Sequence, residues 1–81
     1  MYQTINEQIS VIGVYAHQAF VPRKFLWQRK EYLIDKITFV TDIRDGATRK
    51  RCYSAVSGVN SYRLLFNRNE ETWILDQLWV E

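Results

Sequence analysis

Residues 22–34, PRKFLWQRKEYLI, decide the fold of this chain, because they predict a β-hairpin with aromatic side chains on one face. The turn is expected at residues 29–30, and the expected cross-strand pairs are then Trp27 with Tyr32 and Phe25 with Ile34. Pairs of aromatic and β-branched side chains stabilise a sheet. We therefore expect the other strands to be added around this hairpin.

The segment before the hairpin, residues 8–20, also predicts a strand. It is rich in β-branched and aromatic residues and has no charge pattern that favours a helix. Gly13 inside it indicates a bulge or bend. The Val21-Pro22 step favours an extended backbone and is expected to break the ladder before the hairpin.

After the hairpin, alternating segments and turn residues predict a series of further strands. The second hairpin strand is expected to run from Glu31 to about Thr41, with Leu33, Ile37 and Phe39 on one face. A polar connection over residues 42–48 contains the turn signal Asp45-Gly46. Two alternating strands follow, separated by a turn over residues 57–61. The first has Arg51, Tyr53 and Ala55 on one face and Cys52, Ser54 and Val56 on the other, and the second is expected to point Tyr62, Leu64 and Phe66 inward.

The last segment, residues 72–80, fits two structures. Trp73 and Leu75 alternate as in a strand, whereas the spacing of Ile74 and Leu78 also fits a helix that Asn69 could cap. A strand is favoured because the segment is short and follows a hairpin-like turn. The sequence thus predicts a single all-β domain over residues 1–81, with about six short antiparallel strands in a meander forming a strongly curved sheet or a small, partly open barrel.

The aromatic pattern resembles a known family. The positions are Pro22-x-x-Phe25-x-Trp27, Tyr32-x-Ile34, Tyr62-x-Leu64 and Trp73-x-Leu75-x-x-Leu78. This pattern is similar to that of a family of short bacterial domains of unknown function, which share an F-x-W hairpin near the start and a W-x-L strand at the end. The similarity spans roughly residues 20–80. It implies a stand-alone bacterial β domain and brings no established activity.

Composition limits the possible classes of protein. The chain has 81 residues, of which 47% are hydrophobic and 15% aromatic, so a small packed core is expected rather than disorder. Cys52 is the only cysteine, so an internal disulfide and zinc sites built on paired cysteines are excluded. Residues 1–7 contain no basic segment typical of an export signal, and no apolar run reaches the ~18 residues of a membrane span. We therefore expect a cytoplasmic protein with no membrane partner.

Catalytic patterns are missing from the sequence. His17 is the only histidine, so no second imidazole can join it at a metal. Alternation places Cys52 on a sheet face with Val56, which predicts a buried structural thiol. The three glycines are isolated and form no phosphate-binding loop. The sequence therefore predicts a protein that is not an enzyme and holds no metal or cofactor.

Charge gives the one indication of a partner. Residues 23–51 hold nine of the eleven Lys and Arg residues against four acidic residues. They form a hairpin cluster, Arg23, Lys24, Arg29 and Lys30, and a strand cluster, Arg49, Lys50 and Arg51. If both clusters lie on one surface beside exposed aromatic residues such as Tyr53 or Tyr15, they predict a module that binds single-stranded nucleic acid. The alternative is that these residues are solvated turn and edge residues that discourage aggregation.

A second function class stays open. Aromatic residues beyond the needs of a small core, such as Trp79, Phe20 and Tyr2, could form an apolar patch for a protein partner or for a second copy of the chain. An open strand edge could also accept a partner strand. Salt dependence separates the two hypotheses, because only the phosphate-binding one predicts an affinity that falls steeply with salt.

Overall fold

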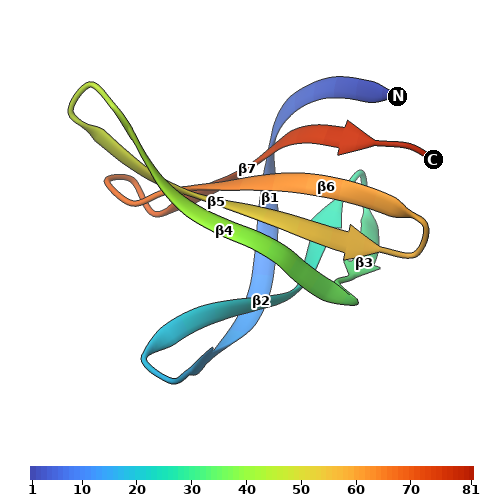
Figure 1. Ribbon diagram of the computed structural model, residues 1–81, viewed down its shortest axis with the longest axis horizontal. Helices are drawn as coiled ribbons and strands as arrows, with labels where there is room; N and C mark the ends of the chain where they lie inside the picture. The colour runs from blue at the N-terminus through green and yellow to red at the C-terminus, as the bar shows by residue number, and fades with distance from the viewer.

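The chain forms one antiparallel sheet of seven strands, as the computed structural model of residues 1–81 describes it. The strands are β1 (Tyr2–Ala16), β2 (Ala19–Trp27), β3 (Lys30–Leu33), β4 (Lys36–Asp45), β5 (Thr48–Ser57), β6 (Asn60–Asn67) and β7 (Thr72–Trp79). Their order in the sheet is β3-β2-β1-β7-β6-β5-β4 (Figure 1). No helix has the length and hydropathy of a membrane span.

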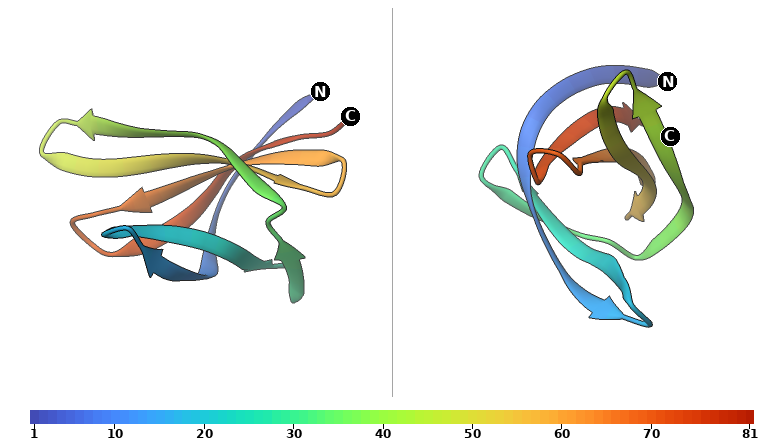
Figure 2. Two further views of the ribbon diagram at one scale, coloured as in Figure 1. Left: turned by 60° about the horizontal axis from the view of Figure 1, so that its bottom comes forward. Right: turned by 90° about the vertical axis from the view of Figure 1, so that its left-hand side faces the viewer.

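The sheet curls into a half-barrel because its ladders are interrupted by bulges. The interruptions occur at Ile5-Asn6 between β1 and β7, at Gly13 between β1 and β2, at Thr38 between β4 and β5, and at Asp76 between β6 and β7. A bulge bends a strand and increases its local twist. The result is an incomplete ring that is open between the edge strands β3 and β4 (Figure 2). The predicted all-β, strongly curved, partly open architecture is confirmed.

The core lies on the concave face of this sheet. Phe25, Leu64 and Leu75 are fully buried there, and Tyr53 and Tyr62 are nearly so. The alternation predicted for β5 and β6 is correct, and the ambiguous last segment is the strand β7.

The predicted register of the first hairpin is wrong by two residues. Its turn consists of Gln28 and Arg29, and Tyr32 therefore pairs with Phe25 instead of Trp27. The Tyr32 ring stacks on Phe25 at a centroid distance of 5.0 Å. Neither turn residue is glycine or asparagine, the residues that normally mark such a turn.

Residues 8–20 are not one strand. A two-residue turn at His17-Gln18 ends β1 and starts β2, and Pro22 lies inside β2 opposite the bulge at Gly13. The predicted irregularity at Gly13 is confirmed, and its extra residue is Arg23 of β2. The ladder is thus interrupted directly after Pro22, as the Val21-Pro22 step predicts, although β2 itself continues to Trp27. The boundary between the first two strands therefore lies at His17-Gln18 instead of Val21-Pro22, and the seventh strand arises further along the chain, at Ile34-Asp35.

The predicted strand from Glu31 to about Thr41 is also two strands. The chain turns at Ile34-Asp35, where the Asp35 N–H donates to the Val56 carbonyl at 2.7 Å and the Asp35 carboxylate accepts from the Gly58 N–H at 2.8 Å. This corner sends β3 and β4 to opposite edges of the sheet. The bulge at Thr38 then turns Phe39 to the convex face, away from the concave side that Ile37 faces.

The connection at residues 42–48 is shorter than predicted. β4 runs to Asp45 and β5 begins at Thr48, so only Gly46 and Ala47 form the turn. Residues 42–45 therefore belong to a regular ladder with β5, which fixes where their side chains point.

Candidate functional site

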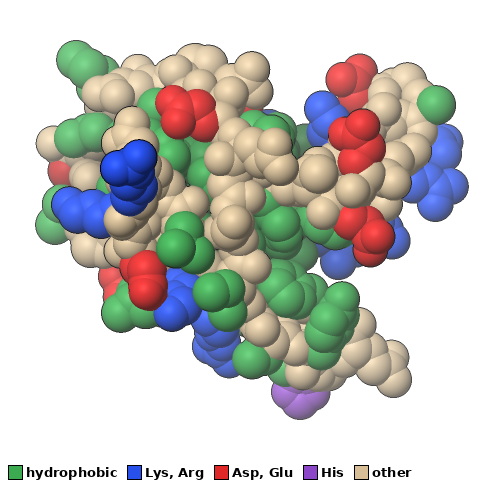
Figure 3. Space-filling model, turned by 180° about the vertical axis from the view of Figure 1, so that it is seen from behind, with side chains coloured by type: hydrophobic (Ala, Val, Ile, Leu, Met, Phe, Trp, Pro, Cys, Tyr) green, Lys and Arg blue, Asp and Glu red, His purple; other side chains and the backbone are tan.

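A cleft opens on the concave side at one end of the half-barrel. The β1–β2 hairpin extends beyond β7 there, because Ile9 is the last residue of β1 that pairs with β7. The space between this hairpin and strands β5 to β7 is about 440 Å³. We name it the aromatic cleft after five of its lining residues: Tyr15, Phe20, Tyr53, Phe66 and Trp73. Figure 3 shows hydrophobic side chains between the hairpin tip that carries His17 and the charged end of the molecule.

The aromatic rings of the cleft support one another. Trp73 lies 4.9 Å from Phe66 and 5.3 Å from Tyr53, measured between ring centroids, and Phe20 reaches it from β2 at 5.9 Å. Phe20 packs over Gly13, where an added Cβ would lie 2.7 Å from the ring and overlap the Val21 carbonyl oxygen. Glycine at the bulge therefore lets Phe20 close one side of the cleft.

The exposure of the two aromatic residues expected to stack on bases differs sharply. Tyr15 is 82% exposed at the rim of the cleft, where its ring packs edge-on against Phe20. Tyr53 is only 4% exposed, so the prediction of a free Tyr53 ring is wrong. Tyr53 belongs to the floor of the cleft, whereas Tyr15 is exposed and Phe20 and Trp73 are partly exposed.

Three arginines lie at the mouth of the cleft, where Arg68 is one of the lining residues and Arg44 and Arg49 lie just outside the lining, beyond Arg51 on the β4–β5 ladder. Arg44 on β4 pairs directly with Arg49 on β5, and the Arg68 N–H donates to the Arg49 carbonyl at 2.8 Å. None of the three forms a salt bridge. We name them the arginine row. Like charges placed opposite each other destabilise a sheet, so the pairing of Arg44 with Arg49 lowers the stability of the fold slightly.

The turn between β6 and β7 positions this row. The Asn69 carboxamide oxygen accepts from the Arg49 N–H at 2.9 Å, and its nitrogen donates to the Ala47 carbonyl at 3.3 Å. Asn67 holds the turn itself by accepting from the N–H groups of Asn69 and Glu70. The turn is thereby attached to the end of β5, which keeps Arg68 beside Arg49.

Arg51 lies one step further into the cleft and is bound to Asp42. Its Nε donates to the Asp42 carboxylate at 2.7 Å. This hydrogen bond holds the pKa of Asp42 below its usual value; loss of hydration opposes the shift, and the charges of Arg51 and Arg68 add to it. The same hydrogen bond, with a smaller contribution from Tyr53, raises the pKa of Arg51. Arg51 is thus paired with Asp42, whereas no member of the arginine row forms a salt bridge.

The structure brings together only part of the predicted site. From the strand cluster, Arg51 and Tyr53 line the cleft and Arg49 lies at its mouth, but Lys50 faces the convex side, 3.9 Å from Asp45. The turn of the hairpin cluster lies at the opposite end of the long axis from the β4–β5 turn (Figures 1 and 2). Arg29 and Lys30 are at that far turn, and Lys24 forms an ion pair with Glu31 at 2.9 Å. The two clusters therefore do not form one patch.

Sequence reasoning missed Arg44 and Arg68. The sequence predicts Arg44 in a polar connection, although its two-residue spacing from Asp42 is a signal that both residues share a strand face. Arg68 lies in the acidic last third of the chain, and no local signal connects it to β5. Phe20, Phe66 and Trp73 were predicted as apolar residues but not as walls of one cleft.

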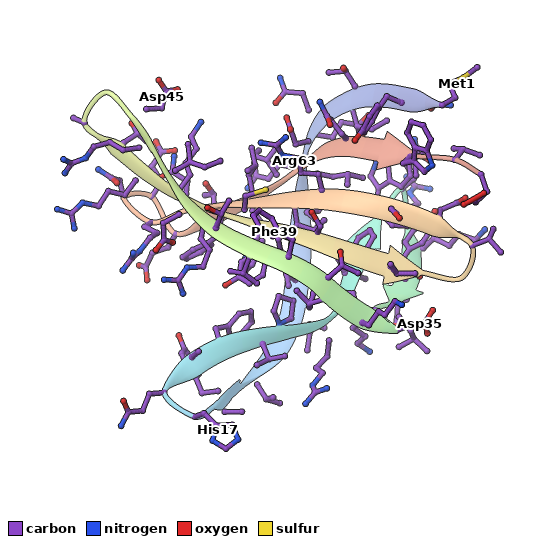
Figure 4. All side chains as sticks on the ribbon, in the orientation of Figure 1. Met1, His17, Asp35, Phe39, Asp45 and Arg63 are labelled. Atoms are coloured by element: carbon purple, nitrogen blue, oxygen red, sulfur yellow. The ribbon has the colours of Figure 1, made fainter.

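The aromatic residues proposed as a protein contact patch are also separated. Tyr2 and Trp79 pair edge-on at 4.6 Å on the convex face, whereas Phe20 lies in the cleft on the concave face. No group of three or more His, Cys, Asp or Glu side chains is placed to share a metal ion. His17 is exposed at the tip of the β1–β2 hairpin, as Figure 4 shows, and Cys52 is buried.

The fold and the cleft define a class of protein: a small antiparallel half-barrel with an aromatic concave cleft bordered by arginines. Comparison with protein-family models, with curated proteins and with solved structures found no match. The resemblance to short bacterial domains stays a prediction that these comparisons do not test.

Proposed function

We propose that this protein binds single-stranded nucleic acid on its concave face, with phosphates at the arginine row and bases in the aromatic cleft. The observation that carries the proposal is the position of three arginines without carboxylate partners at the mouth of a cleft lined by five aromatic residues. Basic grooves combined with stacking platforms are the usual means of holding single strands.

The charge of the arginine row favours a polyanion along the row, while the Glu71 carboxylate lines the cleft beside Arg68. Arg44 and Arg49 repel each other in the free protein, and a phosphate between them would replace that repulsion with two attractions. Arg68 extends the row along the cleft, so that a chain of phosphates fits it better than a single anion. Arg51 adds less charge because Asp42 already occupies its guanidinium group.

The cleft favours a single strand over a duplex. Bases in a duplex are stacked on each other and hide their faces, whereas the exposed ring of Tyr15 and the partly exposed rings of Phe20 and Trp73 need open base faces. Each base stacked on an aromatic side chain contributes about 1–3 kcal/mol. The proposed interface is thus sequence-tolerant and directed at unpaired strands.

The test is a fluorescence-anisotropy titration of labelled single-stranded and duplex DNA and RNA at several salt concentrations. The test variant changes Arg44, Arg49 and Arg68 to Ala. The matched control changes Arg23, Arg29 and Lys30 to Ala, which removes the same charge from residues that also form no salt bridge. We expect the test variant to bind weakly and to lose about 2 units of the log–log salt slope, since each single-strand phosphate contact contributes about 0.7.

Two results would contradict the proposal. One is the absence of single-strand binding by the unchanged protein at low salt. The other is an equal loss of affinity in both variants, because that would reflect net charge alone rather than the arginine row.

A protein partner is the second candidate function. The outer edge of β4 has no neighbouring strand, and Phe39 and Val40 on it are exposed. A partner strand could pair with this edge. Its binding would be nearly independent of salt, so the same titrations with a candidate partner separate it from the first function.

A further inference from the structure

A second groove lies on the convex face, on the opposite side of the sheet from the aromatic cleft. Its volume is about 540 Å³. One row of side chains crosses its floor from strand to strand, in the order Phe39, Ser54, Arg63 and Gln77. The neighbouring row adds Ser61, Trp79 and Tyr2. Figure 4 labels Phe39 on β4 and Arg63 on β6.

Exposed aromatic rings form the walls of this groove. Tyr2 is 67% exposed, Phe39 59% and Trp79 40%. Aromatic side chains normally pack in a protein core. Three exposed rings around one groove therefore indicate a surface that binds a ligand. Tyr2 and Trp79 hold each other edge-on at 4.6 Å, so that this wall is ordered before any ligand arrives.

Arg63 on the groove floor has a hydrogen-bond donor, its Nε, that lacks an acceptor. Its Nε is buried and has no hydrogen-bond partner, although it lies 3.5 Å from an Asp76 carboxylate oxygen. The rest of the guanidinium group is partly exposed in the groove. A buried donor without an acceptor is costly to the folded state, so a ligand that supplies an acceptor would be bound favourably after a small rotation of the side chain.

The charge of the groove favours a neutral ligand. Asp76 neutralises Arg63, and the other side chains that line the groove carry no charge. The polar ones are the hydroxyl groups of Thr38, Thr41, Ser54 and Ser61 and the carboxamide of Gln77. This composition does not attract phosphate, which distinguishes the groove from the arginine row.

We propose that the convex groove binds a neutral oligosaccharide. A sugar ring presents apolar C–H faces, which fit the rings of Tyr2, Phe39 and Trp79, and a rim of hydroxyl groups, which can both donate to and accept from the polar floor. Pockets that combine aromatic walls with a few placed polar groups are typical of small-ligand sites. Arg63 would donate to sugar oxygens, while the Ser54 and Ser61 hydroxyls and the Gln77 carboxamide oxygen accept from sugar hydroxyls.

The test is an NMR titration of the full chain with chitohexaose, cellohexaose and maltohexaose, following the backbone amides and the Trp79 indole N–H. We expect at least one of these sugars to shift the signals of the groove residues and leave those of the aromatic cleft unchanged. Phe39→Ala and Arg63→Met should each weaken that binding about tenfold, which corresponds to 1.4 kcal/mol. The matched control is Leu33→Ala, which removes an exposed apolar side chain on β3, outside both the groove and the cleft, and should leave the affinity unchanged.

The proposal is overturned if none of the three sugars shifts the groove signals, or if the shifts persist unaltered in Phe39→Ala and Arg63→Met. It is also overturned if the groove signals respond to an uncharged peptide of similar length and to no sugar. Phe39 lies on an edge strand with its side chain exposed, so its replacement tests the site with little risk to folding.

Discussion

The backbone of Arg29 lies in the left-handed region, with φ at 63°, next to Gln28 at 53°. Side chains other than glycine are strained there by about 1–2 kcal/mol. Arg29→Gly removes this strain but increases the freedom of the unfolded chain, so we expect a net gain of roughly 0.5–1 kcal/mol in the free energy of unfolding. Urea denaturation measures it.

The control for this prediction is the reverse change at Gly46, whose φ is 62° and where an added Cβ meets no atom within 4 Å. Gly46→Ala should lower the free energy of unfolding by about 1 kcal/mol through backbone strain alone. Equal urea midpoints for the unchanged protein and both variants would show that these turns relax without cost.

Asp42 controls both acid stability and the charge of the cleft. Its pKa is lowered in the folded state by the hydrogen bond from Arg51, so the stability that it contributes is present at neutral pH and is lost as the pH falls below 3.8 through the folded pKa. Asp42→Asn should remove this part of the acid transition. It also frees Arg51 for a phosphate, so we expect tighter single-strand binding and a salt slope larger by about 0.7.

Asp45→Asn is the matched control for Asp42→Asn. It makes the same change in net charge on the same strand, but Asp45 faces Lys50 on the convex side at 3.9 Å. The prediction fails if both variants increase the affinity equally, because net charge would then explain the gain.

Among the elements, the β6–β7 turn is the one that builds the arginine row. Asn69→Ala removes its two hydrogen bonds to the β4–β5 hairpin and leaves the charge unchanged. We expect a loss of about 1 kcal/mol in stability and weaker single-strand binding, because the hydrogen bond from the Arg68 N–H to the Arg49 carbonyl then holds the turn without the two side-chain bonds of Asn69. Anisotropy titration at fixed salt measures the affinity.

The control is Asn60→Ala, at the far end of β6, which should leave the affinity for single-stranded nucleic acid unchanged. Equal affinities of the two variants would exclude a positioning role for Asn69.

The sequence predicts strands correctly where side chains alternate between a buried and an exposed face. This holds for β5, β6 and β7, whose buried residues Tyr53, Leu64 and Leu75 follow the two-residue period. The strand ends at His17-Gln18 and at Ile34-Asp35 were missed, because neither turn contains glycine or proline. Long-range hydrogen bonds, such as that from Gly58 to Asp35, fix the second of these turns, and no local pattern contains that information.

The candidate site is a property of the whole molecule, and this is why sequence predicted it only in part. The arginine row combines β4, β5 and the β6–β7 turn, and its members are adjacent only once the ladder register is set. The basic residues that are concentrated in the sequence over residues 23–51 are, by contrast, divided in the structure between two ends of the molecule and two faces of the sheet. The proposed nucleic-acid cleft and the proposed sugar groove lie on opposite faces of one sheet, so that both could be occupied together.

The shape of the molecule also predicts which part responds to a bound strand. From Ser10 onward, β1 pairs with β2 alone, so the outer half of the β1–β2 hairpin is attached to the rest mainly through the contact of Phe20 with Trp73. Segments with few such contacts open locally with a small free energy.

We expect the amides of residues 14–20 to exchange with solvent faster than those of β6. Bound single-stranded nucleic acid should slow the exchange of residues 14–20, because it would link Tyr15 to the arginine row. Hydrogen exchange with and without saturating oligonucleotide measures this, with the β5–β6 turn at the far end as the reference. If exchange slows equally in the hairpin and in that turn, the oligonucleotide stabilises the whole fold by mass action. That result would exclude an oligonucleotide bound across the cleft.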